Sequence, residues 1–185
     1  MATMLFATRL TLLVLFAISL VAVFATPLVP RDDHEVNSES SDGFKGRFLV
    51  QPPADLDTNV YQVFENGTEI VIFNSTASSM GEPVTFAIDC DTTAASPMYW
   101  DVYEAARRLE VGGRKWCPQN NPGGSRCTTW MANGDAELAV CGHLWAKVDC
   151  DYLAWSARQI VVWCLWNDHA GGKYIWNSDL KGIVY

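Results

Sequence analysis

The side chains best suited to chemistry in this 185-residue chain are its six cysteines. Cysteine thiolates can bind zinc, but zinc sites favour closely spaced pairs such as C-x-x-C, and the chain has none. An even number of cysteines behind a secretory leader instead predicts three disulfides, which persist in an oxidising compartment. We therefore expect no metal and no cofactor. The six cysteines are Cys90, Cys117, Cys127, Cys141, Cys150 and Cys164.

Histidine and acidic side chains could support a second chemistry, general acid–base catalysis. The residues available for it in a secreted hydrolase such as a nuclease are Glu137, His143, Arg158 and His169. Nothing in their spacing requires this role, and the sequence lacks the serine-hydrolase, metalloprotease, phosphate-loop and EF-hand motifs. We expect no catalytic residue and a protein that is not an enzyme, with a small hydrolase as the alternative.

The N-terminus has the features of a secretory signal peptide. Arg9 precedes an apolar run over residues 10–24, about 15 residues against the roughly 20 that a membrane-spanning helix needs. Val23 and Ala25 are the small residues that signal peptidase accepts three and one before its cut. We expect cleavage after Ala25, so that residues 1–25 are removed, no transmembrane segment remains and the protein is secreted.

The expected mature chain is strongly acidic. One of the 13 Lys and Arg residues is Arg9, so 12 remain against 21 Asp and Glu, a net charge of −9. An acidic surface repels phosphate backbones, and nucleic acid is therefore not expected as a partner. The remaining length suits one domain with a hydrophobic core.

Two parts of the mature chain are expected to differ in order. Residues 26–56 are polar, charged and interrupted by prolines, so we expect a disordered tail or pro-segment. Residues 57–185 are expected to form a disulfide-stabilised α/β domain. It should begin with a β-hairpin, because residues 60–64 and 69–73 flank Asn66-Gly67. Asn66 and Asn74 head glycosylation sequons at strand ends, which predicts a glycoprotein.

Strands and helices are expected to alternate through the rest of the domain. Residues 83–89 predict a strand, and Ser96 with Pro97 predicts a helix start. A second hairpin is expected over residues 127–141 around Asn133-Gly134, and further strands over residues 171–176 and 181–185. The helices are indicated by apolar stripes, the first Val102, Ala105, Ala106 and Leu109 and the second Leu153, Ala157, Ile160, Val161 and Cys164.

This element order predicts an α+β fold, with an antiparallel sheet carrying two helices on one face, a split βαβ sandwich preceded by the β-hairpin. Cys90 and Cys164 then lie at one edge of the sheet. Cys127 and Cys141 are nearly equidistant from the hairpin turn, so they face each other within disulfide reach. We predict the pairs Cys90–Cys164, Cys117–Cys150 and Cys127–Cys141.

Candidate binding residues are a basic cluster and one tryptophan. The cluster surrounds the end of the first helix, where cations stabilise the negative pole of the helix dipole. On an acidic protein it could alternatively dock an acidic surface. Trp155 falls off the apolar stripe of the second helix, so we expect it to be partly exposed and available for contact. The cluster consists of Arg107, Arg108, Arg114 and Lys115.

The order of cysteines and elements, with Ile88-Asp89-Cys90, Trp116-Cys117-Pro118 and the strand at residues 171–175, resembles the small cysteine-rich secreted proteins of filamentous fungi. More distantly it resembles the smut-fungus killer toxin family (KP-four type) and its effector-type relatives. The resemblance covers about half of the chain. It implies an α/β sandwich with a split βαβ core. It also implies either growth arrest of competing fungi, with a proposed action on cation channels, or a host-directed effector.

We therefore expect a secreted, non-catalytic protein that binds an unknown extracellular protein or membrane-surface target. Its role would be that of an effector or a killer-toxin-like growth inhibitor. The alternatives are the small hydrolase and a passive cell-wall or surface protein.

Overall fold

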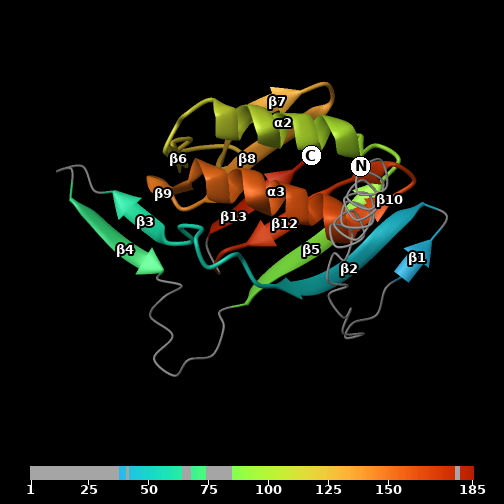
Figure 1. The fold of residues 1–185 in the computed structure, drawn as a ribbon, viewed down its shortest axis with the longest axis horizontal. Coiled ribbons are helices and arrows are strands. Elements are labelled where there is room, and N and C mark those ends of the chain that lie inside the picture. Colours follow the sequence, from blue (N-terminus) through green and yellow to red (C-terminus); the bar gives the residue numbers. More distant parts are fainter. Residues whose placement is uncertain (1–37, 41, 64–67, 74–84, 178–179) are drawn as a thin grey trace, which may run out of the picture. The chain divides into compact units, whose positions relative to one another are not determined.

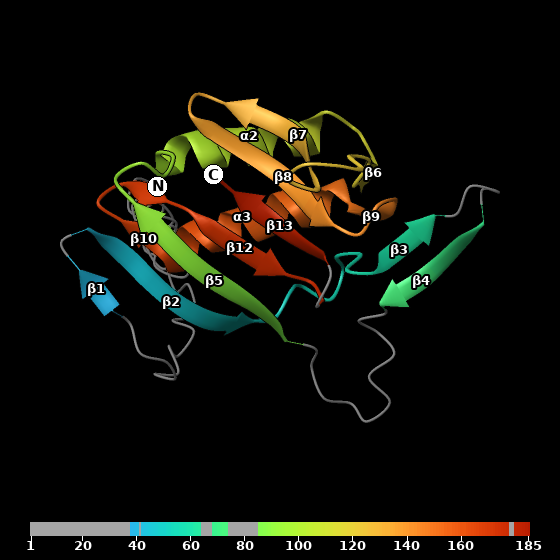
Figure 2. The ribbon, with the colours of Figure 1, turned by 180° about the vertical axis from the view of Figure 1, so that it is seen from behind.

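An antiparallel sheet underlies two helices that both pack on one of its faces (Figures 1 and 2). The computed structural model describes residues 38–40, 42–63, 68–73, 85–177 and 180–185, all within the unit His34–Tyr185. Within these residues the sheet has seven strands. In spatial order they are β1 (Ser38–Ser40), β2 (Gly43–Val50), β5 (Phe86–Thr93), β12 (Gly172–Ile175), β13 (Leu180–Val184), β8 (Ala136–Gly142) and β7 (Cys127–Asn133).

The two helices, α2 (Tyr99–Val111) and α3 (Cys150–Cys164), pack against each other above the sheet. Helix α2 also contacts β7 and β8, while α3 contacts β5, β12 and β13. The predicted fold class is confirmed: the protein is α+β, with a mostly antiparallel sheet, two helices, three disulfides and a β-hairpin before the first helix.

Helix α2 begins two residues later than the sequence predicts, at Tyr99 with Met98 as N-cap. Ser96 is not the cap, because its hydroxyl accepts a hydrogen bond from the Thr93 amide (3.0 Å) and closes a turn instead. The predicted apolar stripe is confirmed, since all four of its residues are buried. The helix ends as expected at Gly112, whose N–H donates to the Arg108 carbonyl.

Helix α3 begins at a cap that the sequence also contains. The Asp149 carboxylate accepts a hydrogen bond from the Asp151 amide (2.8 Å), which satisfies one of the free donors of the first turn. The predicted face is buried against the sheet. Beyond α3 a short hairpin, β10 (Leu165–Trp166) and β11 (His169–Ala170), turns through Asn167 and Asp168.

The prediction of a disordered tail over residues 26–56 is wrong for residues 43–50. These residues form β2, which pairs with β5 along its whole length. Phe44 and Val50 are buried and Phe48 stacks on Trp163, with ring centroids 5.1 Å apart. The charged residues Lys45 and Arg47 made the segment resemble a tail, but they alternate with apolar residues at the period of a strand. The ordered domain therefore starts before residue 57.

A second, four-stranded sheet lies beside the first. Its strands β3 (Val60–Val63) and β4 (Glu69–Phe73) pair as the predicted N-terminal hairpin. Asn66 and Asn74, the two sequon asparagines, lie outside the described residues. The spatial order of the four strands is β4, β3, β9 (Ala146–Asp149) and β6 (Trp116–Pro118). Strands β6 and β9 were not predicted, because they are too short to show an alternating pattern.

The disulfides pair as predicted, Cys90–Cys164, Cys117–Cys150 and Cys127–Cys141. The register of the β7–β8 hairpin places Cys127 directly opposite Cys141, and Gly134 forms the turn with φ 56°. Among the described residues no helix is long and apolar enough to cross a bilayer.

Candidate functional site

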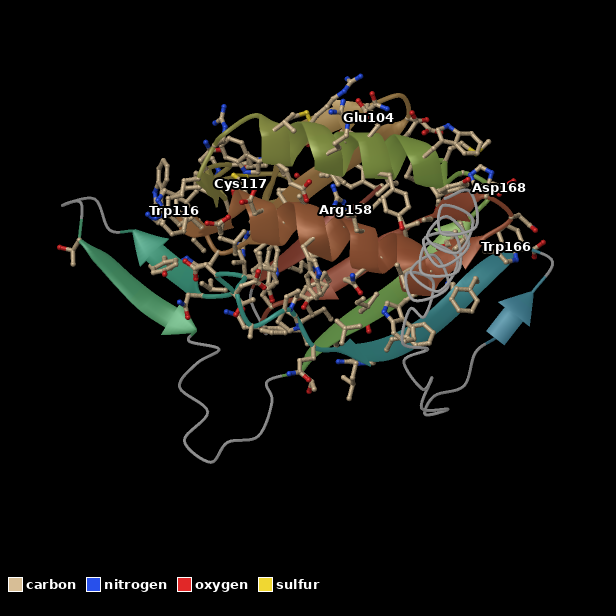
Figure 3. All side chains as sticks on the ribbon, viewed as in Figure 1. Glu104, Trp116, Cys117, Arg158, Trp166 and Asp168 are labelled. Atoms are coloured by element: carbon tan, nitrogen blue, oxygen red, sulfur yellow. A yellow bond between two sulfur atoms is a disulfide. The ribbon has the colours of Figure 1, made fainter. Side chains whose placement is uncertain are left out.

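Two of the three disulfides hold one end of the domain, which also carries part of the predicted basic cluster. Cys117–Cys150 joins β6 to the start of α3, and Cys127–Cys141 joins the start of β7 to β8. We call residues 114–130 with residues 142–149 the basic end. In Figure 3, Trp116 and Cys117 lie there, while Trp166 and Asp168 lie at the opposite end of the helix layer.

At the basic end, cationic side chains lie over tryptophan rings. The guanidinium carbon of Arg114 is 4.7 Å from the Trp130 ring centroid, and Lys115 Nζ is 4.9 Å from the Trp116 centroid. Trp130 is itself fixed, because its Nε1–H donates to the Pro118 carbonyl (3.0 Å). Each such cation–π contact stabilises by about 0.5–1 kcal/mol at an exposed site. The contacts therefore hold the two cations at defined positions on the surface.

A third cation, the buried Lys147, also contacts the Trp116 ring. Lys147 is only 5% exposed, and its Nζ lies 4.2 Å from the Trp116 centroid and 5.8 Å from the Tyr61 centroid. Tyr61 packs edge-on against Trp116 and donates its hydroxyl proton to Asp57. Burial is the main cause that raises the pKa of Tyr61. These contacts attach strand β3 of the N-terminal hairpin to the basic end.

The other half of the predicted basic cluster is paired with a single acid on α2. Both nitrogens of the Arg107 fork donate to the Glu104 carboxylate at 2.8 Å, and Arg108 Nε donates to the same carboxylate at 2.9 Å. These hydrogen bonds lower the pKa of Glu104 to about 2 and raise that of Arg107. The predicted basic cluster therefore consists of two different pairs. Arg107 and Arg108 share the Glu104 carboxylate, whereas Arg114 and Lys115 lie over tryptophan rings.

Most cations away from the basic end are also paired with acids, although Lys173 and Lys181 form no ion pair among the described residues. The further pairs are Lys45–Asp91 (3.3 Å), Arg47–Asp89 (3.5 Å) and Arg158–Glu110 (2.6 Å). By contrast, Arg114, Lys115 and Arg126 form no ion pair with any carboxylate in the part of the chain that the structure describes. The basic end therefore carries three cations that form no ion pair on a chain whose net charge is −8, although the Asp149 carboxylate interacts with Lys115 electrostatically from a longer distance.

A pocket of about 230 Å³ opens at the basic end. It lies between the loop that precedes β7 and the segment that follows β8. Gln119 forms its floor, fully buried, with its side-chain oxygen accepting from the Asn121 amide and its nitrogen donating to the Gly142 carbonyl (3.0 Å). The lining residues are Gln119, Asn121, Pro122, Arg126, Gly142, His143 and Leu144.

The backbone is unusual on both sides of this pocket. Arg126 has φ 52°, and Trp145, which follows the lining residue Leu144, has φ 64°. For residues with a Cβ this left-handed conformation costs roughly 1–2 kcal/mol. The other two non-glycine residues with positive φ among those described are Asn167 and Asp168, whose short polar side chains tolerate it in a turn. Strain of this kind clusters at binding sites, and Trp145 leaves 46% of its surface exposed there.

The remaining predicted contact residue, Trp155, belongs to the core layer. It is half-buried, and its ring lies 5.7 Å from the Tyr174 centroid and 6.0 Å from the Tyr152 centroid. Its partial exposure agrees with its position off the apolar stripe. Its ring contacts are made with buried aromatic residues, so its principal neighbours are structural.

The four residues considered for hydrolysis are not brought together. Arg158 binds Glu110 between the two helices, and His169 Nδ1 lies 2.5 Å from the Ser96 carbonyl oxygen beside the β10–β11 hairpin. Glu137 accepts from Thr129 near the start of β8, whereas His143 follows the end of that strand, roughly 20 Å away along it. Only His143 lines the pocket.

Sequence reasoning missed Arg126, Trp130 and Trp145. One signal was present: a hairpin register that pairs Cys127 with Cys141 also places Arg126 opposite Gly142. The structure shows this contact as a hydrogen bond from the Gly142 N–H to the Arg126 carbonyl (2.8 Å). The positive φ of Trp145 has no sequence signal, because tryptophan rarely adopts that conformation.

The chain matches no protein-family model, no curated protein and no solved structure. In the part of the chain that the structure describes, no group of three or more His, Cys, Asp or Glu residues is placed to hold a metal ion.

Proposed function

We propose that this is a secreted, non-catalytic protein that binds an extracellular target through its basic end. Its role is that of an effector or a killer-toxin-like growth inhibitor. Three disulfides fit an oxidising compartment, and the leader at residues 1–25 supports export to it.

The observation that carries the proposal is the unpaired charge of Arg114 and Lys115. Most other surface cations of the domain neutralise an acid of the same chain, but these two lie over Trp130 and Trp116 instead. Tryptophan and arginine are the residues most enriched in the energetic centres of protein interfaces. Two disulfides beneath them hold the surface in one conformation, which reduces the entropy lost on binding.

Growth of competing fungal cells exposed to the purified, oxidised protein tests this proposal. We expect the oxidised protein to inhibit growth and a reduced, alkylated sample to be inactive. The double variant Arg114→Ala/Lys115→Ala should lose at least about tenfold in potency, since each side chain engages the target. Arg107→Ala/Arg108→Ala is the matched control, because it changes the net charge equally but removes cations that pair with Glu104.

Equal potency of the two double variants would show that the basic end is not the contact surface. If the oxidised protein does not inhibit fungal growth, the growth-inhibitor role is excluded. Binding of the labelled protein to host cell surfaces, with the same two variants, then decides whether it acts as an effector. Absence of binding there as well would overturn the proposal.

One observation favours the alternative of a small hydrolase: His143 lies in the pocket beside Arg126. A catalytic role requires that His143→Ala abolish activity. Under the binding proposal, His169→Ala leaves potency unchanged and His143→Ala changes it only through affinity. Release of product from nucleic acid or glycan substrates, lost in His143→Ala, would establish the hydrolase.

A further inference from the structure

We propose that the pocket at the basic end is a carboxylate site, occupied by an Asp or Glu side chain from an acidic segment of the partner protein. This inference rests on the proposed function, because it names the chemistry of the target that the basic end recognises. It adds Arg126 as the residue that anchors the ligand.

The charge of the pocket selects an anion. Of its lining residues two are ionisable, Arg126 and His143, and both are basic types. Arg126 forms no ion pair with a carboxylate among the described residues. An arginine fork matches the geometry of a carboxylate, since two parallel N–H groups can meet its two oxygens.

The hydrogen bonds within the pocket also indicate Arg126 as the residue that binds the ligand. The amide of Gln119 is used internally by Asn121, Gly142 and Thr128. Asn121 donates from its side chain to the Cys127 carbonyl and accepts from the Gly123 amide. The side-chain amides of Gln119 and Asn121 are therefore occupied by hydrogen bonds within the chain, and they form the wall of the pocket. The guanidinium of Arg126 is the charged donor left for a ligand.

The backbone holds Arg126 in place before any ligand arrives. Its N–H donates to the Gly123 carbonyl (3.1 Å), and its carbonyl accepts from the Gly142 N–H (2.8 Å). The next residue, Cys127, is tied to Cys141. Because the backbone at this position is already fixed, binding restricts only the Arg126 side chain, which limits the loss of entropy.

The pocket is of a size that fits one acidic side chain of the partner. The cations near the pocket could bind further carboxylates of the same partner segment. A volume of about 230 Å³ is below the roughly 300–1,000 Å³ of sites that enclose whole small molecules. The loop that bears Arg126 connects β6, which follows Arg114 and Lys115, to β7. An acidic segment can therefore place one carboxylate at Arg126 and further carboxylates near Arg114 and Lys115. At about 0.1 M salt the acidic remainder of the chain is screened beyond about 10 Å.

The test uses the oxidised protein and a peptide that carries three consecutive glutamates between Gly-Ser flanks, with the glutamine version as control. Titration by NMR should shift the amide signals of Gly142, His143 and Leu144 with the glutamate peptide only. Arg126→Gly should weaken binding at least about tenfold, because it removes a charge-assisted donor. Arg126→Lys should weaken it less, since the charge remains but the fork is lost.

Arg126→Gly also separates binding from folding. Glycine adopts φ 52° without a steric cost, so the melting temperature should change by no more than roughly 3 °C. The control Arg107→Ala should retain full affinity, because Arg107 already binds Glu104.

The outcomes distinguish this inference from the proposed function. If Arg126→Gly keeps full affinity for the peptide while Arg114→Ala/Lys115→Ala loses it, the pocket is not the carboxylate site and the basic end still is the contact surface. If peptide shifts occur at the pocket but Arg114→Ala/Lys115→Ala retains growth inhibition, the proposed role of Arg114 and Lys115 fails while the carboxylate site stands. Tighter binding of an oligogalacturonate than of the peptide would overturn the assignment to a protein partner, as would binding of acetate with equal affinity.

Discussion

The Nζ atom of Lys147 lies 4.2 Å from the centre of the Trp116 ring, although Lys147 is almost fully buried. Lys115 lies over the same ring at 4.9 Å, and Tyr61 packs against it at 5.0 Å. Trp116 therefore joins three parts of the chain: the N-terminal hairpin through Tyr61, strand β9 through Lys147 and the surface through Lys115. Buried cation–π contacts are stronger than exposed ones because the cation has lost its water.

Replacement of Trp116 should lower the free energy of unfolding. We expect Trp116→Leu to cost about 2–4 kcal/mol, since it removes the ring faces that two lysines contact as well as aromatic packing. Urea denaturation of the oxidised protein measures this loss. Trp116→Phe is the control: it keeps a ring face for Lys147 and should cost clearly less. Equal losses for the two variants would show that ring-face contacts contribute nothing beyond buried area.

The three disulfides should differ in how fast they react. Cys127 is the half-buried one of the six cysteines, whereas Cys90, Cys117, Cys141, Cys150 and Cys164 are buried. A reducing thiolate must reach a sulfur atom, so Cys127–Cys141 should be cleaved first. Graded treatment with dithiothreitol, alkylation and peptide mass spectrometry give the order. Earlier loss of either of the other two bonds would contradict this prediction.

The disulfides should also differ in stability contribution. Cys90–Cys164 closes a loop with a sequence separation of 74, and Cys127–Cys141 one of 14. Chain-entropy arguments give about 4 kcal/mol for the longer loop and about 3 kcal/mol for the shorter one. Alanine replacement of both cysteines of each pair, followed by urea denaturation, compares them. A larger loss from the shorter loop would mean that native-state contacts dominate over loop closure.

Stability should fall steeply above about pH 10, because two tyrosines are buried in the core. Burial raises the pKa of Tyr152 and of Tyr174 well above that of tyrosine in water, and the two hydroxyls are hydrogen-bonded to each other at 3.3 Å. The unfolded chain ionises these tyrosines near pH 10 while the folded chain does not. The stability present below pH 10 is therefore lost as pH rises, by about 1.4 kcal/mol per pH unit for each group.

Urea denaturation between pH 9 and pH 11 measures this slope. The double variant Tyr152→Phe/Tyr174→Phe provides the comparison, since all other titrating groups are shared. Its stability should fall by about 2.7 kcal/mol less in total between pH 9 and pH 11, whatever the stability of the variant at neutral pH, because the full slope of about 1.4 kcal/mol per pH unit for each group is approached only well above pH 10. Identical slopes would show that the two hydroxyls ionise as freely in the folded protein as in the unfolded chain.

Replacement by alanine should reduce stability by different amounts at two glycines that have nearly the same φ. Gly134 has φ 56° and Gly124 has φ 59°. A Cβ at Gly124 meets open space, whereas a Cβ at Gly134 clashes with the Asp101 carboxylate, which accepts a hydrogen bond from Asn133. Gly124→Ala should therefore cost about 1 kcal/mol from the backbone alone, and Gly134→Ala about 2 kcal/mol or more. Thermal unfolding measures both, and equal shifts would contradict the clash at Asp101.

Local patterns in the sequence were sufficient for the helices and the two predicted hairpins. The stripe from Val102 to Leu109 is buried as its period requires, and Asn133-Gly134 turns the chain as its tolerance of positive φ requires. Both depend on residues that are near neighbours along the chain. The start of α2 was misplaced because Ser96 and Pro97 belong to a preceding turn whose partner, Thr93, competes for the same serine.

The sequence by itself determined which cysteines form disulfides and how they pair, because element order and hairpin symmetry leave few ways to bring them together. Only the tertiary structure decided which cations are free to bind. Arg107 and Arg114 look alike in the sequence, but one turn of α2 brings Glu104 to Arg107, whereas Trp130 from a distant strand reaches Arg114. Long-range contacts of this kind follow from strand pairing and from backbone conformations such as that of Arg126, and neither is encoded in local spacing.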